Sequence, residues 1–154
     1  MKISLLQVPY DSGHRALRMG AGPQKIIQSG LESDLVNAGH EVRTRSVQVE
    51  SPFQTENGTS FAVIRELAKQ VSDSKRSGAF PLVLAGNCNT CVGTIAGLDT
   101  EKLGVIWLDA HGDFNTPETT QTGFLDGMGL AMLTGKCWKR MMGQVDGFKP
   151  IGES

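Results

Sequence analysis

Short apolar runs alternate with segments of helical periodicity along most of this 154-residue chain. An apolar run that ends at a proline or glycine is typical of a buried strand, whereas apolar residues three and four positions apart mark one face of a helix. Strands that alternate with helices build parallel βαβ units, so we predict an α/β fold with a parallel sheet. The expected strands are 3–8, 41–49, 81–85 and 103–108, and the expected helices are 23–38, 61–78, 90–98 and 127–133.

Length and charge indicate a single α/β domain that spans residues 1–154. The chain carries 15 lysines and arginines against 16 aspartates and glutamates, which gives a net charge of −1. A chain without excess charge has no overall attraction for nucleic acid or for an anionic membrane surface, so we expect neither partner. No apolar stretch reaches the roughly 18 residues that a membrane-spanning helix needs.

The cysteine content points to a reducing compartment. Three cysteines, Cys88, Cys91 and Cys137, are too few for a disulfide scaffold, and free thiols persist where disulfides are reduced. The apolar run at the N-terminus is too short for the central segment of a secretory signal. We therefore expect a cytoplasmic protein.

The most apolar strand candidate, 103–108, runs directly into Asp109, His111 and Asp113. Chemistry in parallel sheets lies beyond the carboxyl ends of the strands, which makes this loop a candidate site. Two carboxylates and one imidazole, spaced by two residues, can converge on one point and suit Mn²⁺, Fe²⁺, Ni²⁺ or Zn²⁺. The alternative is an ordinary loop in which Asp109 caps a turn and His111 makes one hydrogen bond.

The segment 109–117 as a whole resembles the D-A-H-x-D-x-N-T-P loop of the ureohydrolase family, the arginases and agmatinases. Four further stretches resemble the same family: Val8-Pro9-Tyr10-Asp11, Met19-Gly20-Ala21-Gly22-Pro23, Gly86 with Gly93–Leu98, and Gly123–Leu133. The resemblance therefore covers nearly all of the chain. It covers only the N-terminal half of the family fold, because family members are much longer.

This resemblance implies a three-layer αβα fold with a parallel sheet, incomplete in this chain. It also implies a binuclear manganese (Mn²⁺) centre that hydrolyses guanidino or related linear amidine C–N bonds and releases urea. Transfer from the matching motif makes Asp109, His111 and Asp113 metal ligands and places Asn115 against the substrate. Asp126 stands where the family has a histidine regarded as a proton shuttle, so Asp126 is the candidate catalytic residue. Family members are often oligomers, and we expect a homo-oligomer.

Three departures from the family pattern affect the expected metal centre. We align Asn89 with a metal-binding histidine of the family, and an amide oxygen is a poorer ligand than imidazole. Asp126 replaces the shuttle histidine, and the motif that supplies two further metal carboxylates from the C-terminal half does not occur in this sequence. We therefore predict that this chain alone does not bind two metal ions and is inactive. We expect the parent protein to be the hydrolase.

The sheet is affected in the same way, because strands from the C-terminal half separate segments 82–85 and 103–108 in the family. Without those strands, 103–108 lacks neighbours for its backbone hydrogen bonds. Three explanations stay open. The chain is a fragment of a longer protein, the strand pairs beside 82–85, or another chain fills the gap.

Two alternatives concern residues outside the loop 109–117. Cys88 and Cys91 form a C-x-x-C pair, which fits a redox pair, two small buried residues in a turn, or a substitute metal ligand at Cys88 that favours zinc or iron over manganese. A non-catalytic ureohydrolase relative with an assembly or regulatory role is the second function class. Asn89 and Asp126 favour that role, whereas the intact loop 109–117 favours the hydrolase.

Overall fold

The computed structural model describes residues 1–50, 55–98 and 102–152. Its centre is a parallel three-stranded sheet in the order β4–β1–β5. The strands are β1 (Lys2–Val8), β4 (Glu41–Ser46) and β5 (Phe80–Ala85). In the middle strand, Leu5 lies opposite Thr44 on one side and opposite Leu82 on the other. The strands expected at 3–8 and 81–85 are confirmed, and the strand expected at 41–49 ends earlier, at Ser46. Helices on both faces of the sheet explain why the consecutive residues Ile3–Leu6 of β1 are all buried.

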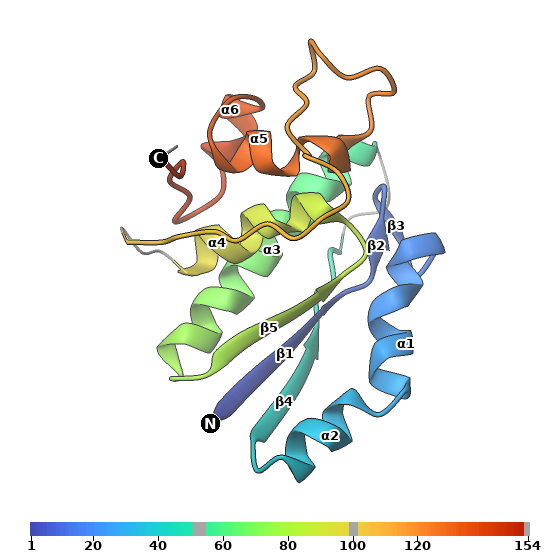
Figure 1. The fold of residues 1–154 in the computed structure, drawn as a ribbon, viewed down its shortest axis with the longest axis vertical. Coiled ribbons are helices and arrows are strands. Elements are labelled where there is room, and N and C mark those ends of the chain that lie inside the picture. The colour runs from blue at the N-terminus through green and yellow to red at the C-terminus, as the bar shows by residue number, and fades with distance from the viewer. Residues whose placement is uncertain (51–54, 99–101, 153–154) are drawn as a thin grey trace.

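Helices cover both faces of this sheet, as Figure 1 shows. The helices α1 (Gly22–Gln28) and α2 (Leu31–Asn37) lie on one face. On the other face lies α3 (Glu56–Arg76), with α4 (Cys91–Leu98) packed along it. The expected αβα layering is therefore confirmed. The helix expected over 23–38 is two helices, because Gly30 adopts a left-handed φ of 110° between them.

The long helix α3 links the two parts of the hydrophobic core. It begins after Thr55, whose hydroxyl oxygen accepts a hydrogen bond of 3.0 Å from the backbone N–H of Gly58. Its apolar residues face in two directions. One cluster against the sheet contains Leu6, Val8, Tyr10, Val47, Val63, Leu67 and Val71, and a second cluster contains Phe61, Ile64, Ala68, Val92, Ala96, Leu125, Met128 and Met132 among others.

Close contact between α3 and α4 depends on glycine. A Cβ added to Gly93 would lie 2.6 Å from the carbonyl oxygen of Ile64. A Cβ on Gly97 would meet the carbonyl oxygen of Ala68 in the same way. The two glycines therefore let the backbones of the two helices approach each other and hold the start of α4 in a fixed place at the end of β5.

The segment 103–108 is not a strand, which corrects the sequence prediction. It pairs with no strand in the part of the chain that the structure describes. Its side chains alternate, so that Trp107 packs against the second cluster while Ile106 and Leu108 are 88% and 93% exposed. Figure 1 shows the segment crossing in front of α4. A strand forms where a neighbour accepts its backbone hydrogen bonds, and β5 does not supply one here.

None of the described helices is long and apolar enough to cross a bilayer.

Short elements lie at the carboxyl end of the sheet. The helix expected over 127–133 begins with a 3₁₀ turn and is shorter than predicted, and the sequence did not predict the short helix at 139–142. The short elements are β2 (Tyr10–Asp11), β3 (His14–Arg15), η1 (Arg18–Ala21), η2 (Cys88–Thr90), η3 (Leu125–Met128), α5 (Gly129–Leu133) and α6 (Lys139–Met142).

Candidate metal centre

Three segments meet beyond the carboxyl end of the sheet: the turn after β5, the loop after 103–108, and η3 with α5. They bring together Cys88, Asp109 and Asp113, whose ligand atoms all lie within 4.8 Å of one another. We call these three residues the Cys–Asp–Asp cluster. The Sγ of Cys88 lies 3.8 Å from Oδ2 of Asp109, and the thiol donates a weak hydrogen bond to that oxygen. Two of the three predicted metal ligands therefore converge, and the third member is a cysteine.

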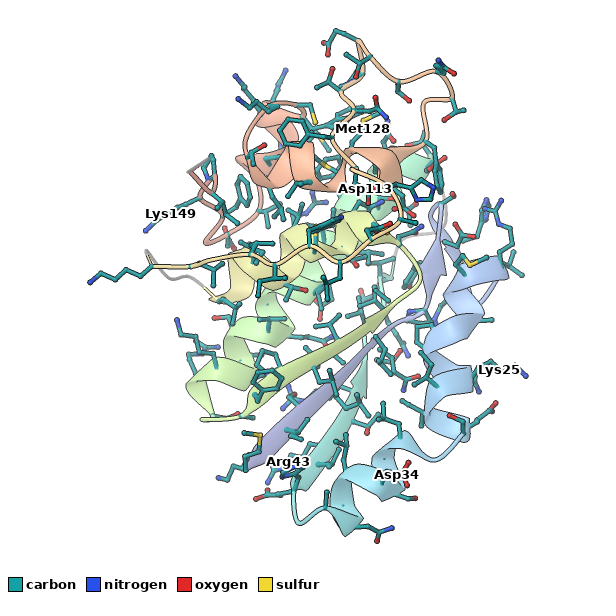
Figure 2. All side chains as sticks on the ribbon, in the orientation of Figure 1. Lys25, Asp34, Arg43, Asp113, Met128 and Lys149 are labelled. Carbon is teal, nitrogen blue, oxygen red and sulfur yellow. The ribbon has the colours of Figure 1, made fainter. Side chains whose placement is uncertain are left out.

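Asp113 is the buried member of the cluster. Its residue is 7% exposed, and its Oδ2 has no hydrogen-bond partner among the described residues. Its backbone is fixed because the N–H groups of Leu130 and Ala131 donate to its carbonyl oxygen at 2.9 and 3.2 Å. Burial raises the pKa of Asp113, and the neighbouring Asp109 carboxylate adds to the rise. In Figure 2, Asp113 lies beside the helical turn that carries Met128.

The backbone of Asp113 is strained. Its φ of 45° lies in the left-handed region, which costs a non-glycine residue of order 1 kcal/mol. The hydrogen bonds from the start of α5 hold this conformation. The strained backbone and the buried carboxylate therefore belong to the same residue of the cluster, Asp113.

Asp109 and His111 form a local pair at the open side of the cluster. The Oδ1 of Asp109 accepts a hydrogen bond of 3.0 Å from the backbone N–H of His111 and lies 3.5 Å from the Nδ1 of its ring. That backbone N–H lowers the pKa of Asp109. The His111 side chain is 84% exposed and is not a member of the cluster. The structure therefore places His111 next to Asp109 but does not bring it together with Asp113.

Asp126, the predicted catalytic residue, is held by two asparagines. The Nδ2 of Asn87 donates to Oδ2 of Asp126 at 2.6 Å, and the Nδ2 of Asn89 donates to its Oδ1 at 2.8 Å. The backbone N–H of Asn89 adds a longer bond of 3.3 Å. Burial raises the pKa of Asp126 overall, although these hydrogen bonds act in the opposite direction. The carboxylate is therefore fixed in orientation beside η2.

The position of Asn89 corrects the alignment made from the sequence. Asn89 is 3% exposed and its amide faces Asp126, whereas the Sγ of Cys88 faces the carboxylates of Asp109 and Asp113. Cys88, not Asn89, thus occupies the position from which a side chain reaches the predicted metal ligands. The sequence carried a usable signal, because Cys88 has the most common metal-binding side chain among residues 87–89.

The polar groups beneath the cluster form a network that ties the loops together. Asn87 also donates to Oδ1 of Asp11 at 3.3 Å, and its own Oδ1 accepts from the backbone N–H of Ser12 at 3.0 Å. Asp11 is 4% exposed and pairs with the Nε of Arg18 at 2.9 Å. Asn87 therefore joins the loop after β1 to the turn after β5 and to η3.

Asn115, the predicted substrate contact, lies on the exposed loop after the cluster. Its backbone N–H donates to the carbonyl oxygen of Gly127 at 2.9 Å, and its side-chain Oδ1 accepts from the hydroxyl of Thr119 at 3.2 Å. These bonds fix the loop relative to η3. The structure gives Asn115 no contact with the cluster itself among the interactions of the described residues.

The cluster does not lie in a cavity of about 850 Å³ that is lined by α3, α4, residues 48–50 and residues 146–147. That cavity carries side chains of both charges, among them Arg65, Glu66, Lys69 and Asp73. None of the three residues of the Cys–Asp–Asp cluster lines this cavity.

Similarity to known proteins identifies the family of this chain. The sequence matches the family described as Arginase family over residues 1–145. The chain belongs to the arginase family. It is 35% identical to the arginase of Staphylococcus aureus strain MRSA252 over 153 residues and 36% identical to the arginase of Brevibacillus brevis over 158 residues. These matches cover 91% and 96% of this chain.

Solved arginase structures share the fold of this family member. The crystal structure of arginase from Bacillus subtilis matches with a TM-score of 0.86 at 31% identity, and that from Bacillus cereus with 0.84 at 33%. Each match covers 97% of this chain but only 52% or 53% of the other. The chain likewise spans about half the length of the curated relatives it matches.

The arginase family is generally metal-dependent, and the described residues fit one cation. The Cys–Asp–Asp cluster offers two carboxylates and a thiol, and the buried Oδ2 of Asp113 lacks any other partner among the described residues. A buried carboxylate oxygen without a hydrogen bond is costly, and a cation would satisfy it. For a second ion, the described loop would offer only His111 and a shared Asp109.

Proposed function

We propose that the protein carrying this chain is a metal-dependent hydrolase that cleaves guanidino or related linear amidine C–N bonds and releases urea. Family membership supports the reaction class, and the names of the curated relatives support the substrate class. The single observation that carries the proposal is the orphaned, buried Oδ2 of Asp113 beside Asp109 and Cys88. Carboxylates held in this way without a cation are unfavourable, so their presence favours a metal centre.

In this proposal Asp109 and Asp113 bind one metal ion of the complete centre, and His111, beside Asp109, would bind the other. A bound divalent ion, Mn²⁺ in the family resemblance, supplies an acidified water. Asn115 stays the proposed substrate contact, and Asp126 the proposed catalytic residue. The raised pKa of Asp126 supports an acid–base role, because a carboxyl group transfers protons best when its pKa approaches the working pH.

We propose that this chain alone is inactive. The Cys–Asp–Asp cluster suits one ion, and the exposed Ile106 and Leu108 lack the neighbouring strands that the family resemblance implies. The proposal extends to a homo-oligomeric protein. It also places the protein in the cytoplasm, which the free thiols of Cys88, Cys91 and Cys137 support.

One observation favours the second candidate, a non-catalytic subunit with an assembly or regulatory role. The carboxylate of Asp126 already accepts three hydrogen bonds, from Asn87 and Asn89. A group engaged in this way is poorly placed to relay protons unless those bonds rearrange.

Urea release from a panel of guanidino compounds separates the two candidates. The protein is purified from the cells that make it, together with any polypeptide that accompanies it, and is assayed with Mn²⁺, Ni²⁺ or Zn²⁺. The hydrolase proposal expects urea from at least one compound and its loss in Asp113→Asn. Release of no urea from any compound, with the metal bound, would support the non-catalytic subunit instead.

A further inference from the structure

The turn after β5 aims a thiol at the two carboxylates. Residues Cys88–Thr90 form the 3₁₀ turn η2, which is closed by a hydrogen bond from the Thr90 hydroxyl to the carbonyl oxygen of Asn87 at 2.6 Å. The side chains of Asn87 and Asn89 are both anchored on Asp126. Because both neighbours are fixed, the direction of the Cys88 side chain is fixed as well. Its Sγ lies 3.8 Å from Oδ2 of Asp109 and is one of the ligand atoms of the cluster.

A second observation concerns the carboxylate of Asp113. Its Oδ2 is buried and has no hydrogen-bond partner among the described residues, and the nearest donor is the thiol of Cys88 itself. Buried polar atoms are nearly always paired, so an exception indicates a missing ion or other group. This oxygen belongs to Asp113, one of the three residues whose ligand atoms lie within 4.8 Å of one another.

We propose that Cys88, Asp109 and Asp113 bind one divalent cation through a thiolate and two carboxylates, and that this donor set selects Zn²⁺ over Mn²⁺. This site is also the metal centre of the proposed hydrolase, and the inference depends on the proposed function in no other respect. Thiolate is a soft ligand that favours zinc, whereas carboxylate and water suit manganese.

The geometry is compatible with a tetrahedral zinc ion. Zinc binds sulfur at about 2.3 Å and carboxylate oxygen at about 2.0–2.2 Å, which separates its ligands by about 3.3–3.8 Å. Ligand atoms within 4.8 Å of one another therefore need to close by about 1.5 Å at most. The exposed side of the cluster, beside His111, leaves the fourth position open to water.

Binding changes the protonation of one group. The Sγ–H bond of Cys88 breaks, its proton passes to solvent, and the sulfur electron pair forms the bond to the cation. No electron is transferred, so the step needs no oxidant or reductant. Cation binding to the wild-type chain is therefore expected to release one proton from Cys88.

Cobalt is the spectroscopic probe for the test. Co²⁺ is added to the full 154-residue chain under reducing conditions, and the near-ultraviolet thiolate-to-cobalt charge-transfer band is recorded. We expect the band in the wild type, its loss on addition of equimolar Zn²⁺, and its persistence in excess Mn²⁺. Absence of the band, or Mn²⁺ that displaces Co²⁺ as effectively as Zn²⁺, overturns the proposal.

Matched variants assign the band to one sulfur. Cys88→Ser is expected to remove the band and to weaken Zn²⁺ binding more than about 100-fold, since even the loss of a group that only supports a ligand costs 10–100-fold. Cys91→Ser is the control, because the Sγ of Cys91 lies near the carbonyl oxygen of Gly129 and outside the cluster. A band that survives in Cys88→Ser contradicts the assignment.

A second substitution keeps the test decisive if Cys88→Ser folds poorly. Cys88→His places a nitrogen donor at the same position, and we expect it to bind a cation without the charge-transfer band and with improved Mn²⁺ affinity relative to Zn²⁺. Unchanged metal preference in Cys88→His refutes the selectivity. Urea release by the purified protein without the charge-transfer band would support the hydrolase and contradict the zinc site. The band without urea release from the purified protein would support the zinc site and contradict the hydrolase.

Discussion

The side-chain amide of Asn87 donates a hydrogen bond of 2.6 Å to the carboxylate of Asp126 and a second, of 3.3 Å, to that of Asp11. One buried amide thus connects the loop after β1, the turn after β5 and η3. The positions of Cys88 and Asn89 on either side of it follow from this anchoring.

Asn87→Ala should destabilise the protein, because it leaves two carboxylates short of a donor and the backbone N–H of Ser12 short of an acceptor. We expect the free energy of unfolding in urea to fall by about 1–3 kcal/mol. Asn115→Ala is the matched control, since its exposed side chain should change this value by less than about 0.5 kcal/mol. Equal effects of the two substitutions would argue against the buried network.

Metal titration of the wild-type chain should show no more than one tight site. The described residues provide a single cluster, and the carboxylates expected from the family's other half are not in this sequence. Calorimetry should give one binding event that Asp113→Asn abolishes. His111→Ala should leave that event within about tenfold in affinity, because His111 lies outside the cluster. Two tight sites would overturn this expectation.

Cys137 should make the stability of the protein depend on alkaline pH. Burial raises the pKa of its thiol from 9.0 to about 11, and the Glu118 carboxylate adds to the rise. Between these values the folded chain keeps a proton that the unfolded chain loses, so the free energy of unfolding falls as pH rises. The stability difference between wild type and Cys137→Ala, measured by urea denaturation, should shrink from pH 9 to pH 11. A constant difference would contradict the prediction.

Gly93→Ala should be destabilising although alanine favours helices. The added Cβ would lie 2.6 Å from the carbonyl oxygen of Ile64, which forces α4 away from α3. We expect a loss of about 1–3 kcal/mol, larger than the gain of roughly 0.5–1 kcal/mol in helix propensity. Gly104→Ala is the control, because nothing lies within 4 Å of its added Cβ. Thermal unfolding of the two variants measures the difference.

Ile106→Lys should leave the stability of this chain nearly unchanged, within about 0.5 kcal/mol, because the side chain is 88% exposed. Trp107→Ala should cost about 2–4 kcal/mol, since Trp107 packs against the second core cluster beside Gly129. Urea denaturation of both variants tests the one-sided packing of this segment. A large loss in Ile106→Lys would show that the outer face of the segment is packed after all.

The sequence alone was sufficient to predict the strands β1, β4 and β5 and the helices α3 and α4. The apolar run of β1 and the stripe of Phe61, Leu67 and Val71 on α3 are local patterns, and local periodicity determines which face of an element is buried. The convergence of Asp109 and Asp113 was likewise predictable, because the two carboxylates lie four residues apart in one loop and a loop of this length can turn both toward one point.

Tertiary contacts decided what local patterns cannot encode. The apolar composition of 103–108 predicts a strand, yet a strand needs a neighbour to complete its hydrogen bonds, and the described chain offers none. Residues 87–89 are adjacent in sequence, and only their long-range bonds to Asp11 and Asp126 turn Asn89 inward and leave Cys88 beside Asp109. Side-chain direction in a tight turn is set by distant partners, so the metal-facing residue became visible only in the folded structure.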